Sequence, residues 1–135
     1  MSPATSLSLY FAAGALGGLV NSLAVWGLGE LGVTRALGVS IAPALTAAWL
    51  YPRIVWGGLW GLLFALPLRS PGWVRRGLVL SLGPSLVQLF VVFPVRDGRG
   101  VLGLEHGALT PVLVLFATAV WGLVASWWVR GTAAA

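Results

Sequence analysis

Long apolar runs without charge are the feature that most constrains this chain. The first, Leu7 to Leu28, has about 22 residues and no charged side chain, enough to cross the ~30 Å hydrocarbon core of a bilayer. Only 8% of the residues are charged, whereas a soluble domain carries about 25%. Because 59% of the 135 residues are hydrophobic, a soluble fold of this size could not bury them all. The sequence therefore predicts an all-α integral membrane protein whose solvent is the lipid bilayer.

Four runs are long enough to form membrane-spanning helices in a single transmembrane domain over residues 1–135. The expected spans are 7–28, 44–68, 77–95 and 109–129. They predict a four-helix transmembrane bundle. Residues 29–43 form a weaker apolar segment, which would be a loop, a short interfacial helix or the start of a further span, so a count of five spans stays open.

The stretch Ala36 to Leu68 is almost wholly apolar but has Tyr51-Pro52-Arg53 in its middle. Three arrangements fit this pattern. The first is one span from Ala44 to Leu68, kinked at Pro52, because proline removes a helical hydrogen bond. The second is a hairpin with its turn at Tyr51-Pro52-Arg53, and the third is a pair of re-entrant half-helices buried in protein.

An internal similarity favours the single kinked span. Arg35 and Arg99 are each followed at the same distance by Ala-Leu-Thr, and about nine residues later by Val-Trp-Gly. The two Val-Trp-Gly triplets begin at Val55 and Val120. This pattern predicts a tandem duplication of a two-helix unit, in which the second pair of spans keeps the orientation of the first.

The arginines predict the orientation of the chain. Cytoplasmic loops of membrane proteins carry an excess of basic residues. The basic loop with Arg69, Arg75 and Arg76, together with Arg130, would therefore lie on the cytoplasmic side. Four spans then place both termini in the cytoplasm, and we expect a multi-pass protein of the cell inner (plasma) membrane.

Each expected span carries a stripe of small or weakly polar residues. Small residues let membrane helices approach closely, since lipid gives helices no hydrophobic reason to associate. The residues expected to pack helices together are Gly14, Gly18, Gly57, Gly61 and Gly122.

The same stripes carry the polar residues of the spans. The candidates for a polar core or pathway are Asn21, Arg53, Gln88 and Thr118. Two interpretations stay open: hydrogen-bonded packing between helices, or a ligand site. Arg53 is the sharpest candidate, because a charge inside a membrane is costly and marks a functional site by default. The alternative for Arg53 is a position at the membrane surface, where its side chain reaches the interface.

The composition excludes several classes of chemistry. The chain has no cysteine and one histidine, His106, so neither thiol catalysis nor a metal site is expected. No cofactor, catalytic residue or enzymatic activity is predicted. The net charge of +5 comes from arginines spread singly between apolar runs, which indicates lipid headgroups and topology rather than nucleic acid as the partner.

Two functions fit these observations. The first is a structural or accessory membrane subunit, which associates through its glycine-rich helix faces with a second copy or with a larger membrane complex. The alternative is a small channel or carrier for a small anion or neutral solute, with Arg53 in the pathway. A polar cavity that reaches Arg53 would favour the second function.

Overall fold

The computed structural model describes residues 2–66 and 72–132, which are helical and contain no strand. Three helices are long and apolar enough to cross a membrane: α1, α4 together with η2, and α5. In chain order, the elements are α1 (Pro3–Glu30), α2 (Val33–Ala36), α3 (Ala47–Gly61), the 3₁₀ helix η1 (Leu62–Ala65), α4 (Trp73–Val87), the π-helix η2 (Gln88–Arg96), the 3₁₀ helix η3 (Val101–His106) and α5 (Thr110–Arg130).

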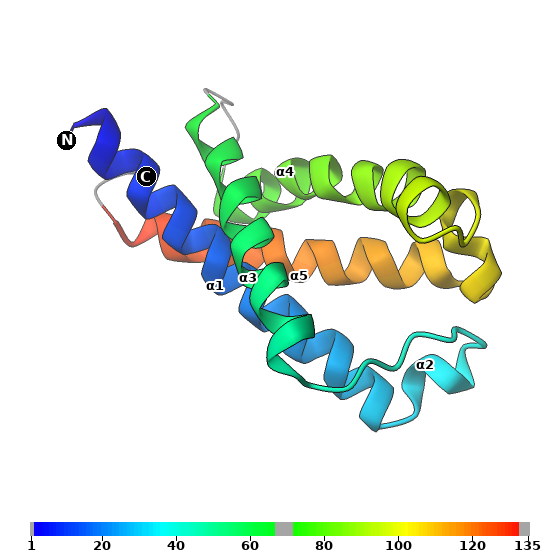
Figure 1. The fold of residues 1–135 in the computed structure, drawn as a ribbon. Helices are drawn as coiled ribbons and strands as arrows, with labels where there is room; N and C mark the ends of the chain where they lie inside the picture. Colours follow the sequence, from blue (N-terminus) through cyan, green and yellow to red (C-terminus); the bar gives the residue numbers. More distant parts are fainter. Residues whose placement is uncertain (1, 67–71, 133–135) are drawn as a thin grey trace.

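Helices α1 and α5 lie side by side, α3 crosses α1, and α4 packs along α5 (Figure 1). Both ends of the chain lie at one end of the structure, while α2 and the η2–η3 connection lie at the other. The connections at that end touch each other, because the Ser40 amide donates to the carbonyl oxygen of His106 at 2.8 Å.

Glycines bring α1 and α3 together at their crossing. A Cβ atom placed on Gly14 would lie 2.6 Å from the Cα of Gly61, and one on Gly18 would lie 2.8 Å from the carbonyl oxygen of Arg53. Real Cβ atoms do not come that close, so the two backbones leave no room for a side chain. Gly57 faces the same contact from α3, with Gly18 Cα at 2.9 Å from its Cβ position. Four of the five expected packing glycines thus lie in one interface.

The fifth, Gly122, lies where α5 meets α4. A Cβ atom on Gly77 would be 2.9 Å from the carbonyl carbon of Gly122, and the Ser126 hydroxyl donates to the Trp73 carbonyl oxygen at 2.7 Å. Trp121 fills the interface between α5 and α1. Its indole Nε1 donates to the carbonyl oxygens of Gly14 at 3.1 Å and Gly57 at 3.2 Å.

The central stretch differs from its expected bounds. Residues 44–46 are not helical, because Thr46 caps α3 by accepting a hydrogen bond from the Trp49 amide at 3.2 Å. The helix then runs through Pro52 without a break, which excludes a turn at residues 51–53 and a pair of half-helices. Pro52 lies in the second turn of α3, so it deprives only one early carbonyl of its partner. Residues 67 and 68 lie outside the described residues, and the kink at Pro52 stays a prediction.

The other bounds differ in smaller ways. Helix α1 is longer than the expected 7–28, and α4 begins four residues before the expected 77. Residues 29 and 30 are the end of α1, and residues 31–43 contain only the single turn of α2 and a stretch without regular structure, so residues 29–43 do not form a further span. Helix α5 begins at Thr110, one residue later than expected.

The glycine contact between α1 and α3 is testable with a matched pair in one helix. We expect Gly14→Ala to lower the free energy of unfolding by ~1–3 kcal/mol, because the added methyl group overpacks the interface. The control is Gly27→Ala, where nothing lies within 4 Å of the Cβ position, and it should leave stability equal or higher by up to ~1 kcal/mol. Unfolding of the purified variants in mixed detergent micelles measures both values. Equal effects of the two changes would contradict the packing described above.

Candidate functional site

Arg53 lies inside the helical bundle rather than at its end. Its partners on α1, Asn21 and Ser22, lie about five residues beyond the middle of that helix, or roughly 7–8 Å at 1.5 Å per residue. The side chain is half-buried. The side chain therefore lies between helices of the bundle rather than in a turn, and its depth in a membrane stays a prediction.

Three neighbours hold the guanidinium group of Arg53. Its Nε donates to the Ser22 hydroxyl at 2.9 Å, and its Nη2 donates to the Asn21 side-chain oxygen at 2.7 Å. The Trp49 ring stacks near it, with its centroid 4.7 Å from the guanidinium carbon. Ser22 can accept this bond because its own proton goes to the Gly18 carbonyl oxygen, 2.6 Å away.

Asn21 extends the network from α3 to α5. It is buried, and its amide nitrogen donates to the Ala117 carbonyl oxygen at 2.5 Å while its oxygen accepts from Arg53. Thr118, the next residue of α5, makes a hydroxyl–hydroxyl hydrogen bond with Ser85 of α4. Asn21, Arg53 and Thr118 thus lie in neighbouring polar contacts that join α1, α3, α4 and α5.

Gln88 is the expected site residue that stays outside this network. It begins the π-helix η2 and is half-buried, and its amide makes no hydrogen bond to any described residue. Around the helix axis, Gln88 lies between two faces. The face with Gly83 contacts Trp60 of α3, and the face with Ser85 contacts Thr118 of α5. π-Helical segments occur often at functional sites.

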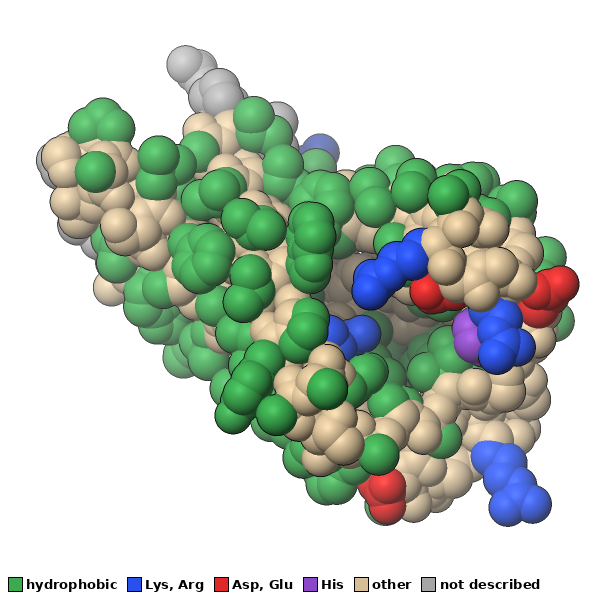
Figure 2. All heavy atoms as spheres, in the orientation of Figure 1, with side chains coloured by type: hydrophobic (Ala, Val, Ile, Leu, Met, Phe, Trp, Pro, Cys, Tyr) green, Lys and Arg blue, Asp and Glu red, His purple; other side chains and the backbone are tan. Residues whose placement is uncertain are grey.

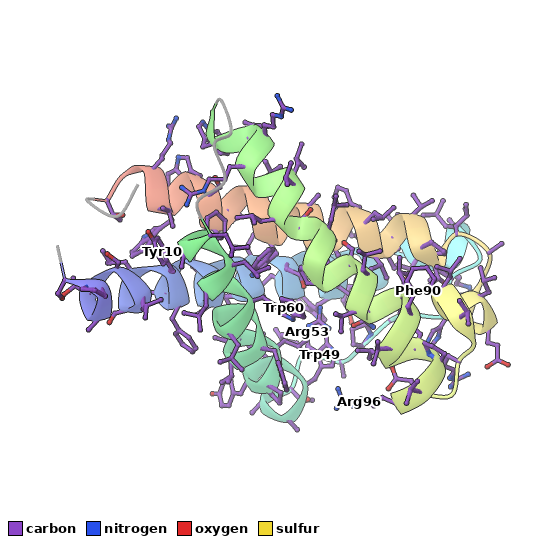
Figure 3. All side chains as sticks on the ribbon, turned by 90° about the horizontal axis from the view of Figure 1, so that it is seen from above. Tyr10, Trp49, Arg53, Trp60, Phe90 and Arg96 are labelled. Atoms are coloured by element: carbon purple, nitrogen blue, oxygen red, sulfur yellow. The ribbon has the colours of Figure 1, made fainter. Side chains whose placement is uncertain are left out.

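A hollow opens on the molecular surface beside Arg53. Figure 2 shows it between α3 and the region of η2 and η3, with a basic side chain inside it. On α3, four large residues repeat at helical spacing and therefore share one face: Trp49, Arg53, Trp56 and Trp60. Figure 3 shows Trp49, Arg53 and Trp60 directed into the space between α3 and α4, with Arg96 near the far end of that space and Phe90 on the side of η2 away from α3.

The charge of Arg53 has no acidic partner. Among the described residues, the polar contacts of its side chain are those with Asn21, Ser22 and the Trp49 ring. The three acidic residues of the chain, Glu30, Asp97 and Glu105, are all exposed and lie outside α3, α4 and α5. The third nitrogen, Nη1, makes no hydrogen bond and is not sealed from the surface. A cation at this depth without a counter-ion attracts an anion.

Sequence reasoning missed Ser22 and Trp49, which hold Arg53 in place. Both carried a signal, because Ser22 continues the four-residue spacing of Gly14 and Gly18, and Trp49 lies four residues before Arg53 on the same helix. The region around the single histidine, His106, gives no comparable site. His106 packs edge-on against Phe93, and no group of three or more metal-ligating side chains gathers among the described residues.

Two shallow depressions lie elsewhere, around Trp127. The larger, about 420 Å³, is lined by residues 127–128 and 130–132, and the smaller, about 190 Å³, is lined by Trp73, Leu123, Val124 and Trp127. Neither contains a buried charge.

Comparison of the chain with models of protein families, with curated proteins and with solved structures finds no match. The chemistry of the Arg53 site therefore carries the functional interpretation.

The coupling of Arg53 and Asn21 is testable with a double-mutant cycle. Asn21→Leu should lower the free energy of unfolding by about 3 kcal/mol, because it leaves the Nη2 donor of a half-buried charge without its partner. Arg53→Met removes that charge, so the double variant should be more stable than the sum of the single changes by ~1–3 kcal/mol. The control cycle pairs Asn21→Leu with Arg35→Met, an exposed position, and should be additive. Additivity in both cycles would refute the coupling.

Proposed function

We propose that the protein is a four-helix membrane bundle in which α3 with η1 forms the fourth crossing. Residues 47–65 are apolar apart from Arg53, and along the chain they lie between the end of α1 and the start of α4. The position of both chain ends on one side supports an even number of crossings (Figure 1). With the basic residues Arg75, Arg76 and Arg130 on that side, both termini would be cytoplasmic in the plasma membrane.

We also propose that the bundle consists of two tandem helix pairs. Matching contacts in the pairs α1–α3 and α4–α5 support this. The Gly61 Cβ position meets the Tyr10 carbonyl oxygen, and Ser126 donates to that of Trp73. Residues of α1 correspond at a constant spacing to residues of α4, and residues of α3 correspond at a constant spacing to residues of α5. The corresponding pairs are Tyr10/Trp73, Gly14/Gly77, Gly18/Ser81 and Ser22/Ser85, and then Arg53/Thr118, Trp56/Trp121, Gly57/Gly122 and Gly61/Ser126.

This correspondence sets Arg53 apart. The contact between Ser22 and Arg53 in the first pair corresponds to the contact between Ser85 and Thr118 in the second. The neutral hydroxyl of Thr118 is enough for packing at that position. A charged residue in its place in the first pair therefore serves a purpose beyond joining two helices.

We propose that the protein is a small channel or carrier that binds a small anion at Arg53. The observation that carries this proposal is a guanidinium group fixed by Asn21 and Ser22, with Nη1 turned free of partners beside a hollow. An uncompensated positive charge favours an anion over a neutral solute. The accessory role has less support, because the glycines expected to mediate association lie against helices of the same chain.

The four crossings are testable by the sidedness of two single-cysteine variants in this cysteine-free chain. Arg35→Cys and Arg75→Cys lie before and after α3, and both positions are exposed. A membrane-impermeant thiol reagent should label them from opposite sides of intact vesicles. Labelling of both from the same side would mean that α3 does not cross.

Anion passage is testable with purified protein in phospholipid vesicles. We expect uptake of chloride, nitrate or phosphate above that of protein-free vesicles, and a rate at least tenfold lower for Arg53→Gln. Arg35→Gln is the matched control, because Arg35 is exposed and lies outside the site, and its rate should equal that of the unchanged protein. Uptake equal to empty vesicles for all three anions would contradict the transport proposal.

A further inference from the structure

We propose that the hollow beside Arg53 binds an amphiphilic anion, a molecule with one phosphate or carboxylate head on an apolar chain, which enters from the bilayer. This rests on the proposed anion binding at Arg53 and names the class of ligand. Four features of the structure support it: the direction of the opening, the residues of the walls, the contrast with the corresponding interface, and the free edge of the guanidinium group.

The hollow opens sideways from the bundle. The long helices run across the view in Figure 1, and Figure 2 shows the hollow facing the viewer in the same orientation. Its mouth therefore lies between α3 and α4, on the side that lipid surrounds in a membrane-spanning bundle. A ligand dissolved in the bilayer can reach the hollow through this mouth.

The wall of the hollow that α3 provides is mainly aromatic. Trp49, Trp56 and Trp60 share the face of α3 that carries Arg53, and Figure 3 shows Trp49 and Trp60 directed into the space between α3 and α4. Trp56 is 59% exposed, so no other helix covers it. On the opposite side, towards η2 and η3, Figure 2 shows basic and acidic side chains at the rim. The aromatic wall suits an apolar chain.

The corresponding interface elsewhere in the chain is closed. Trp121, which corresponds to Trp56 in the proposed duplication, is 4% exposed and packs between α5 and α1. Between α3 and α4, the contact instead lies at Gly83, whose Cβ position is 3.1 Å from the Leu63 side chain and 3.6 Å from that of Trp60. Toward Arg53 the two helices diverge (Figure 1). The hollow thus occupies a space that a helix contact fills in the other half.

The head of the ligand would bind one edge of the guanidinium group. The protein uses the edge formed by Nε and Nη2, which donate to Ser22 and Asn21. The edge formed by Nη1 and the second proton of Nη2 remains, and two parallel donors of this kind match a carboxylate or a phosphate. The Trp49 ring fixes the plane of the group. The amide of Gln88, which has no partner among the described residues, provides a further donor on the side of η2.

Titration calorimetry in a neutral detergent tests this inference with three probes: octyl phosphate, inorganic phosphate and 1-octanol. We expect octyl phosphate to bind at least tenfold more tightly than inorganic phosphate, and 1-octanol not to bind measurably. Arg53→Gln should weaken octyl phosphate at least tenfold, and Arg35→Gln should leave it unchanged. Trp56→Ala should weaken octyl phosphate at least threefold and leave inorganic phosphate unchanged, and this exposed position is a safe second variant if Arg53→Gln does not fold.

The outcomes separate this inference from the proposal on which it rests. Equal affinities for octyl phosphate and inorganic phosphate, both lost in Arg53→Gln, would overturn the amphiphile and leave anion binding at Arg53 standing. Binding of neither phosphate would overturn both. Octyl phosphate binding that survives Arg53→Gln and Trp56→Ala would mean that the chain dissolves in detergent or on lipid-facing helices, and the inference would be wrong.

Discussion

The close contact of α1 with α3 determines how the rest of the structure is placed. Because Gly14, Gly18 and Gly57 carry no side chains, the two backbones approach closely enough for Arg53 to reach Asn21 and Ser22 one turn further along. The same contact presents the carbonyl oxygens of Gly14 and Gly57 to the indole of Trp121, which fastens α5 to the crossing. A larger residue in the crossing would therefore disturb the polar network and the α5 contact together.

The cost of the Arg53 charge explains why its surroundings are polar on one side only. In a low-dielectric interior, a charge without hydrogen bonds is strongly unfavourable, and Asn21, Ser22 and the Trp49 ring offset part of that cost. No carboxylate among the described residues offsets the rest. A bound anion would complete the neutralisation. Thr118, which corresponds to Arg53 in the proposed duplication, needs no such partner, and no hollow is required beside it.

Much of this arrangement is predictable from the sequence. The charge-free runs predict the long helices, and the spacing of the small residues predicts which faces meet, because both depend on local periodicity. The three choices for the central stretch could not be separated, since Pro52 is compatible with a helix as well as a turn, and the Thr46 cap that decides the start of α3 is a single hydrogen bond. The hollow could not be predicted at all. It results from α3 and α4 diverging beyond Gly83 (Figure 1), which depends on the angle between two helices rather than on any residue pattern.

The central claim is that Arg53 holds an anion inside the bundle, and anomalous diffraction tests it most directly. Crystals grown from lipid with selenate, a heavier analogue of phosphate and sulfate, would show an anomalous peak within hydrogen-bonding distance of Nη1 of Arg53. The account predicts this peak in the hollow between α3 and α4, with Asn21 and Ser22 still bound to the other edge. A peak only at exposed arginines such as Arg35, with Arg53 covered by a closed contact of α3 and α4, would contradict it.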